Sequence, residues 1–188
     1  MNRVGVIADC AHSGWQTSLE AARASSMPMV CSHSGCANVN AHHRCKPDEV
    51  IRAICDTGGY IGICCIPAFL GGSGDINAFL NHIDHVVKVF GADHVTIGTD
   101  TAYSSRTPAS QQGGVPRHKS RPRWENFWQP NDPLFDRKWH EPHMQESLAW
   151  TNWPLFTVGM VQRGYNDEDI RKILGGNVLR VAKAVLRR

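Results

Sequence analysis

The sequence lacks the features of several protein classes. None of its apolar runs approaches the length of a membrane-spanning helix. It has no large excess of charge of one sign, because 20 Lys and Arg residues stand beside 17 Asp and Glu residues and the formal net charge is +3. The first residues enter an apolar stretch at once, so no signal peptide is evident. We therefore expect no membrane segment and no nucleic-acid partner.

The cysteines show no pattern of a disulfide framework or a zinc ribbon. All seven lie between Cys10 and Cys65, their number is odd, and no pair has the CxxC spacing. We expect reduced thiols that act as small apolar residues, as in a cytoplasmic protein.

The size and composition are those of one globular domain. The chain has 188 residues, of which 41% are hydrophobic. The apolar stretch at about 3 to 9 predicts a buried parallel strand at the very start, with nothing before it to pair with it. We therefore expect residues 1–188 to be a single domain that is part of a longer barrel.

Two stretches near the start predict neighbouring strands that each lead to a histidine. The first strand leads to His12, and the stretch 27–33 ends at His33. The helix expected from about 15 to 24 is the only element that fits between them, as in a parallel βα unit. Since the carboxyl ends of parallel strands share one edge, the two imidazoles can meet there and form half of a zinc site. For either histidine taken alone, the simpler interpretation is that it caps the end of its strand.

Further helices and strands follow in alternation. They are expected as a helix at about 47–57, a strand at 60–66, a loop at 68–74, a helix at 76–90 and a strand at 95–100. The last strand ends on Asp100, and we expect His82 and His85 to be ordinary, partly exposed residues of the helix before it. Four βα units with polar groups at strand ends predict an α/β fold that is about half of a TIM barrel.

The stretch 101–147 has no periodicity and is expected to be a long loop. Its landmarks are His118, Trp124, Trp128, Trp139 and His140. A loop of this length is functional or disordered, and its tryptophans favour a lid over the strand ends. Its basic residues at 117–123 suit a solvated segment. Two helices, at about 148–163 and 167–187, end the chain, and Gly175 and Gly176 interrupt the second.

Several short motifs occur in a recognisable order along the chain. They are Asp9-Cys-Ala-His12, Cys31-Ser-His33-Ser34, Arg44 followed by Pro47-Asp-Glu49, Gly98-Thr-Asp100 and Gly175-Gly-Asn177 with Arg180-Val181. Together they resemble the C-terminal half of the membrane (renal) dipeptidase family, over essentially the whole chain except the long loop. The resemblance implies a binuclear zinc hydrolase on an amidohydrolase-type TIM barrel, which cleaves dipeptides.

The resemblance also implies roles for four residues. His12 and His33 would be the two terminal ligands of one zinc ion. Arg44 would bind the C-terminal carboxylate of a dipeptide, for which its planar, permanently charged fork is suited. Asp100 would orient the free amino group of the substrate or assist proton transfer. The metal pair would acidify a water molecule and polarise the scissile carbonyl.

The sequence also departs from the family pattern. The HxD pair and the bridging glutamate that complete the two metal sites have no counterpart, and the usual asparagine after Arg44 is Cys45. The second aspartate and the glycine expected after Asp100 are replaced by 101–103. Two alternatives therefore stay open: a non-catalytic half-barrel that assembles with a missing N-terminal half or as a homodimer, and another hydrolase of the amidohydrolase superfamily.

Overall fold

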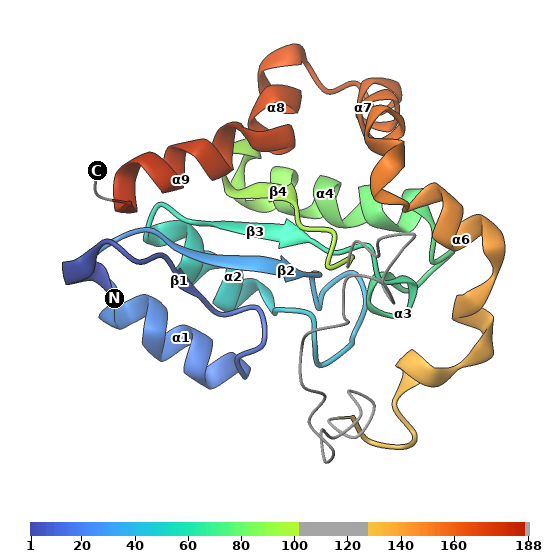
Figure 1. Cartoon of the computed structure of the whole chain (residues 1–188), viewed down its shortest axis with the longest axis horizontal. Coiled ribbons are helices and arrows are strands. Elements are labelled where there is room, and N and C mark those ends of the chain that lie inside the picture. Colours follow the sequence, from blue (N-terminus) through green and yellow to red (C-terminus); the bar gives the residue numbers. More distant parts are fainter. Residues whose placement is uncertain (102–127, 187–188) are drawn as a thin grey trace, which may run out of the picture.

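The computed structural model describes residues 1–101 and 128–186, and a parallel sheet forms its centre (Figure 1). The strands are β1 (Ala8–Asp9), β2 (Met29–Ser34), β3 (Tyr60–Ile63) and β4 (Val95–Ile97), and they pair in the order β1-β2-β3-β4. Every pairing is parallel. Each consecutive strand therefore lies beside its predecessor, as the predicted succession of βα units requires.

Helices connect the strands and follow the last of them. They are α1 (Trp15–Ala24), α2 (Asp48–Asp56), α3 (Pro67–Leu70), α4 (Ile76–Phe90), α6 (Pro142–Ser147), α7 (Trp153–Gln162), α8 (Asp167–Arg171) and α9 (Asn177–Val185). The carboxylate of Asp75 caps α4 by accepting two backbone N–H groups of its first turn, at 2.9 and 3.4 Å. The predicted interruption at Gly175 is confirmed, because a distorted turn at Lys172–Gly176 separates α8 from α9.

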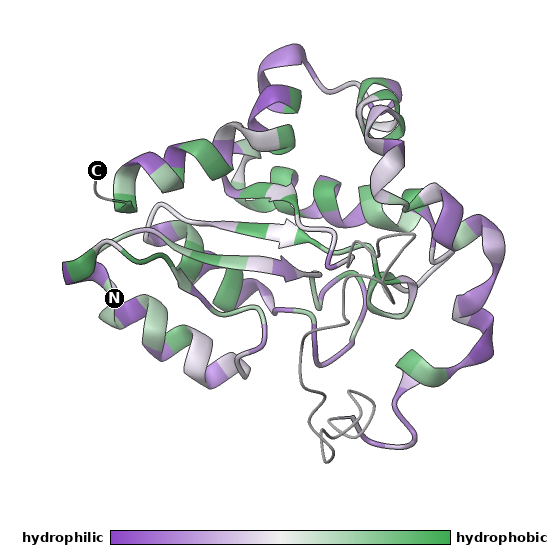
Figure 2. Cartoon of the chain, in the orientation of Figure 1, coloured by the Kyte–Doolittle hydropathy of each residue, from purple (hydrophilic) through white to green (hydrophobic). Residues whose placement is uncertain are grey.

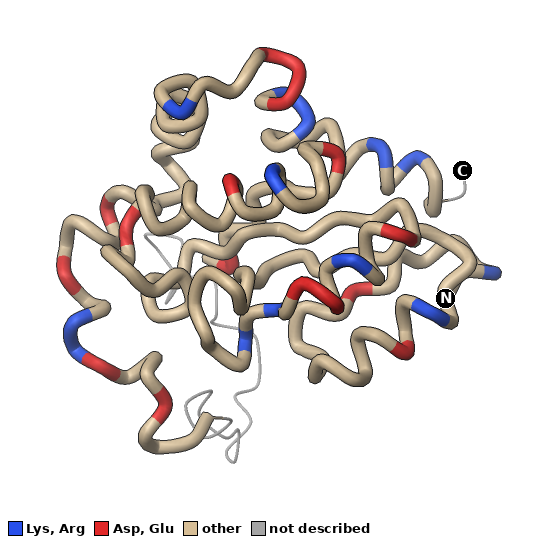
Figure 3. The backbone as a smooth tube through the Cα atoms, turned by 180° about the vertical axis from the view of Figure 1, so that it is seen from behind, with Lys and Arg blue, Asp and Glu red and all other residues tan. Residues whose placement is uncertain are grey.

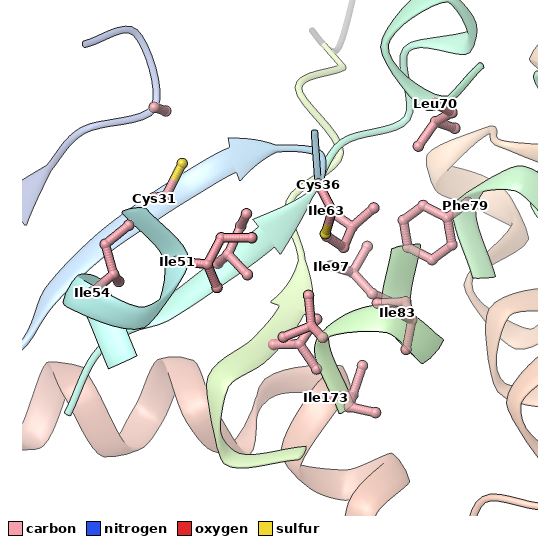
Figure 4. Close-up of a cluster of buried hydrophobic side chains, with 14 of the residues drawn as sticks. Cys31, Cys36, Ile51, Ile54, Ile63, Leu70, Phe79, Ile83, Ile97 and Ile173 are labelled. Atoms are coloured by element: carbon pink, nitrogen blue, oxygen red, sulfur yellow. The ribbon is translucent and has the colours of Figure 1, made fainter. Parts of the chain in front are cut away.

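The main core lies between one face of the sheet and the helices α1, α2 and α4. Ile51 and Ile54 of α2 and Phe79 and Ile83 of α4 are buried against strand residues such as Ile63 (Figure 4). A smaller cluster on the other face joins strands β2 and β3 to α9. Its buried members are Val30, Tyr60, Val181 and Val185. Figure 2 shows apolar residues along β3 and alternating apolar and hydrophilic turns along α9.

The sheet is strongly curved. Gly98, which follows β4, approaches β2 across β3 so closely that a Cβ atom there would lie 1.9 Å from the carbonyl oxygen of Ser32. Curvature of this kind is the geometry of a barrel wall. Charged residues lie mainly on helices and connecting segments (Figure 3), and Asp9 is the only one in the four strands.

The strands expected at 60–66 and 95–100 end earlier, at Ile63 and Ile97, and three other predicted elements also differ from the structure. The first strand begins at Ala8 instead of about residue 3, and Val4 and Val6, expected to be buried, are exposed. The predicted loop 68–74 overlaps helix α3, because Pro67 starts a turn of helix. The described part of the stretch 101–147 contains α6 and two short 3-10 helices, whereas the predictions for His118 and Trp124 lie outside the described residues.

The prediction that His82 is partly exposed was wrong. Its side chain is fully buried, since α4 is covered at this point by the loop after β2 and by the end of α3. The ring accepts a hydrogen bond from the backbone N–H of Cys36 at 2.9 Å and donates one to the carbonyl of Leu70 at 3.0 Å. His85, by contrast, is half-buried and contacts Asp48 at 2.8 Å.

No helix among the described residues is long and apolar enough to cross a membrane.

Candidate metal and substrate site

A short hydrogen-bonded chain fixes His33 at the carboxyl end of β2. The Ser32 hydroxyl donates its proton to Asp9 Oδ2 at 2.5 Å, and the same hydroxyl lies 2.8 Å from His33 Nδ1. Because a hydroxyl has one proton, it must accept the Nδ1–H of His33. The other ring nitrogen, Nε2, then carries a lone pair. A metal-binding histidine has this arrangement, with its second ring nitrogen donating to a neighbouring oxygen.

His12 meets His33 at the same edge of the sheet. Their Nε2 atoms are 2.9 Å apart and their ring centroids 4.9 Å. Burial lowers the pKa of His12, and the nearby charge of Arg44 and the His33 ring lower it further. The neutral form of His12, which is the form that binds metals, is therefore favoured.

Arg44 lies on the His12 side of this pair. The side chain is buried, its guanidinium donates a hydrogen bond to the carbonyl of Ala11, and it lies 5.5 Å from the centre of the Phe69 ring. Its Nε atom has no partner among the described residues. The backbone of Arg44 is held from both sides, by the ring of His42 at 3.1 Å and by the hydroxyl of Ser34 at 2.6 Å.

Asp100 lies on the other side, after β4. One carboxylate oxygen is 3.8 Å from His33 Nε2. Its backbone has a φ of 55°, a left-handed conformation that is uncommon for a residue with a side chain and is often found at functional sites. The structure therefore brings all four predicted site residues to one edge of the sheet, with the histidines between Arg44 and Asp100.

The two histidines fit one metal ion. Two nitrogens bound at about 2.0–2.1 Å to a tetrahedral zinc lie roughly 3.3 Å apart, and the observed Nε2 separation is 2.9 Å. The lone pair of His33 Nε2 faces His12, and the Asp100 carboxylate supplies an oxygen nearby. The sequence did not single out Ser32 as a supporting residue, because its role depends on the pairing of β1 with β2.

A second group of metal-ligand residues lies beside Arg44. His42, His43 and Asp132 each offer a donor atom, and these atoms lie within 4.8 Å of one another. His42 Nε2 is 3.5 Å from one carboxylate oxygen of Asp132, and His43 Nδ1 is 3.6 Å from the other. His42 and Asp132 are buried, whereas His43 is exposed. These three residues could hold an ion, and Asp132 comes from the stretch predicted as a lid.

The hydrogen bonding of His42 favours a different role for this group. His42 Nδ1 accepts the backbone N–H of Arg44, so in the neutral ring the proton is on Nε2, which faces Asp132. A metal at Nε2 would require that proton to leave and the bond to Arg44 to be lost. His42 therefore anchors the backbone of Arg44 through Nδ1, whereas its Nε2, 3.5 Å from an oxygen of Asp132, has no hydrogen-bond partner among the described residues.

The comparison with protein families gives a match over the first part of the chain. Residues 1–111 match the model of membrane dipeptidase (peptidase family M19). Dipeptidase tcpJ of Claviceps purpurea (strain 20.1) is 27% identical over 188 residues, which are 98% of this chain and 36% of that protein. Dipeptidase verJ of Clonostachys rogersoniana is also 27% identical, over 98% of this chain and 39% of that protein. The chain thus spans well under half the length of these relatives.

Solved structures share the fold. An amidohydrolase from Pseudomonas aeruginosa matches with a TM-score of 0.71 and 26% identity, over 98% of this chain and 54% of that one. A metallopeptidase from Rhodobacter sphaeroides, liganded with a phosphinate mimic of the dipeptide L-Ala-D-Ala, matches with a TM-score of 0.67 and 20% identity, over 98% and 44%. The predicted partial TIM barrel is confirmed. With more than half of its residues matched, the chain belongs to the membrane dipeptidase family, peptidase family M19.

Proposed function

We propose that the chain forms part of a zinc-dependent dipeptidase, with His12 and His33 as ligands of one zinc ion. The observation that carries this proposal is the meeting of the two Nε2 atoms, 2.9 Å apart, with the lone pair of His33 Nε2 fixed by Ser32 and Asp9. A zinc ion held there would supply Lewis-acid polarisation of a scissile carbonyl and a more acidic water.

The chain's own residues would bind and orient the dipeptide. Arg44 receives the C-terminal carboxylate, because it is a cation beside the His12–His33 pair and its Nε is unpaired among the described residues. Asp100 pairs with the free amino group and is near enough to His33, at 3.8 Å, to exchange protons with groups at the reaction centre. With one anchor for the carboxylate and one for the amino group, the site would suit a short peptide whose two ends are both free.

Zinc binding tests the assignment of ligands. Because a catalytic zinc site usually has three protein ligands, we expect at most one zinc ion per chain and weak binding. His33→Ala should abolish it in a chelator-competition titration. His143→Ala, at an exposed position of α6, is the matched control and should leave it unchanged. Tight binding of two zinc ions per chain, or retention of zinc by His33→Ala, would contradict the proposal.

A substrate assay tests the chemistry. A dehydrodipeptide with added zinc should be hydrolysed, and a phosphoester should not, if the dipeptidase proposal is correct. Hydrolysis of the phosphoester alone would favour another activity of the amidohydrolase superfamily.

The open edges of the sheet favour a second candidate, a non-catalytic half-barrel that assembles with another polypeptide or a second copy. Within the described residues, β1 pairs only with β2 and β4 only with β3. Unpaired strand edges are binding surfaces for further strands. Light scattering separates the possibilities, since a monodisperse monomer that hydrolyses the dehydrodipeptide would exclude this candidate.

The free cysteines support a reducing location. All seven are buried, and none forms a disulfide. We propose that the protein is cytoplasmic, which fractionation of the source cells can test.

A further inference from the structure

We propose that an apolar cavity beside Asp100 receives the side chain of the dipeptide's N-terminal residue. The inference rests on the proposed function and adds a substrate class to it. The cavity has a volume of about 310 Å³, and its walls come from residues 65–67 after β3, from 148–150 after α6, and from Thr101 and Gln145. None of these residues carries a charge.

The cavity lies next to the amino-group end of the site. Thr101 follows Asp100 directly, and the backbone N–H of Cys65 donates to the carbonyl of Thr99 at 3.0 Å. Burial raises the pKa of Cys65 to about 12, and the negative charge of Asp100 contributes to this rise. Arg44 is not among the lining residues, and its guanidinium contacts Ala11 and Phe69 instead.

The chemistry of a dipeptide fixes which side chain would enter. The free amino group is one bond from the α-carbon of the N-terminal residue, so an amino group on Asp100 presents that residue's side chain to the cavity. The side chain of the C-terminal residue, whose carboxylate Arg44 would bind, lies farther from Asp100 along the peptide. The inference therefore concerns the N-terminal position alone.

The walls select for apolar side chains. Most of the lining is aliphatic, aromatic or sulfur-bearing, and the volume is at the lower end of the range for small-molecule pockets, roughly 300–1,000 Å³. A charged side chain would lose its hydration there without gaining a partner. Leucine in place of glycine at the N-terminal position should raise affinity about 10- to 100-fold, from the typical gain on burying a branched aliphatic side chain.

Isothermal titration calorimetry of the zinc-loaded chain with Gly-Gly, Leu-Gly and Gly-Leu tests the inference. Chromatography of the recovered ligand checks that it is intact. Ala149→Phe fills the cavity and should remove the gain of Leu-Gly over Gly-Gly, while the affinity for Gly-Gly is unchanged. Ala53→Phe is the matched control, because it makes the same change in a separate cavity of about 360 Å³ between α1 and α2. It should leave all three affinities unchanged.

The outcomes separate the cavity from the proposed function. A gain for Leu-Gly that Ala149→Phe removes supports the inference. Equal affinity for Leu-Gly and Gly-Gly, a larger gain for Gly-Leu, or a gain that survives in Ala149→Phe overturns the inference and leaves dipeptide binding intact. Absence of binding by all three dipeptides overturns both. If circular dichroism shows that Ala149→Phe does not fold, Gln145→Trp at the exposed side of the cavity takes its place.

Discussion

Acidification should destabilise the chain through His82. The ring is fully buried between α4 and the loop that leads from His33 to Arg44, and both nitrogens are in hydrogen bonds, to Cys36 and Leu70. Burial lowers the pKa of His82 from 6.5 to about 4. A second ring proton would also displace the backbone N–H of Cys36, since that group donates to Nδ1.

The size of the effect follows from the difference between the folded and unfolded pKa. As the pH falls, the unfolded chain binds a proton at His82 first, near its ordinary value of 6.5, while the folded chain resists until about 4. The stabilisation is therefore complete above pH 6.5 and is lost as the pH falls towards 4. Since a tenfold change in proton affinity is about 1.4 kcal/mol, the loss is about 2 kcal/mol at pH 5 and about 3 kcal/mol below pH 4.

Urea unfolding at pH 7.5 and pH 5.0, followed by circular dichroism, measures the effect. His82→Gln keeps a donor and an acceptor but does not titrate. Between pH 7.5 and pH 5.0, the free energy of unfolding of this variant should therefore fall by about 2 kcal/mol less than that of the natural chain. The variant should be less stable at pH 7.5, by about 1–3 kcal/mol. His143→Gln, at an exposed position, should respond to pH as the natural chain does. An equal pH response in His82→Gln and the natural chain would refute the reasoning.

Two further substitutions address the substrate site and the packing of the last helix. Arg44→Lys should weaken dipeptide binding about 10- to 100-fold by calorimetry, since a lysine cannot form two parallel bonds to a carboxylate; unchanged affinity would exclude Arg44 as the carboxylate anchor. Asn177→Ala should lower the free energy of unfolding by about 2–3 kcal/mol, because the Asn177 side chain donates to the buried carbonyls of Ala92 and Val95, both at 2.8 Å. A loss below about 0.5 kcal/mol would show that other groups satisfy these carbonyls.

The meeting of His12 and His33 could be predicted because it depends on local pattern and one general rule. Two apolar stretches with a single helix between them form neighbouring parallel strands, and neighbouring strands end at the same edge. That order brings the two residues to one edge of the sheet, where their Nε2 atoms lie 2.9 Å apart. The capped helices and the break at Gly175 were predictable for the same reason, since each depends on residues close together in the sequence.

The first strand shows where local pattern fails. Residues 3–9 have the composition of a strand, yet only Ala8 and Asp9 pair, with Met29 and Val30. Extending the ladder backwards would place Ile7 opposite Pro28, which has no N–H to donate. Strand length is thus decided by the partner's sequence, and Val4 and Val6 are left exposed.

His82 could not be identified as buried for a related reason. Its neighbours on α4 form an apolar stripe, which covers one side of the helix, and a polar residue beside such a stripe is ordinarily half-exposed. The His82 ring is buried against backbone groups of Cys36 and Leu70. The residue pattern of the helix does not indicate these contacts, because both groups lie outside it.

The supporting residues of the candidate site extend this argument. His12, His33 and Asp100 lie at or just after strand ends, so the succession of strands points to them. A residue that orients another, as Ser32 orients His33 and Asp132 faces His42, requires only that two chain segments meet, and many residue types could serve. The candidate ligands of such a site can therefore be predicted from one sequence. The contacts that set the tautomers and orientations of their rings depend on the folded arrangement.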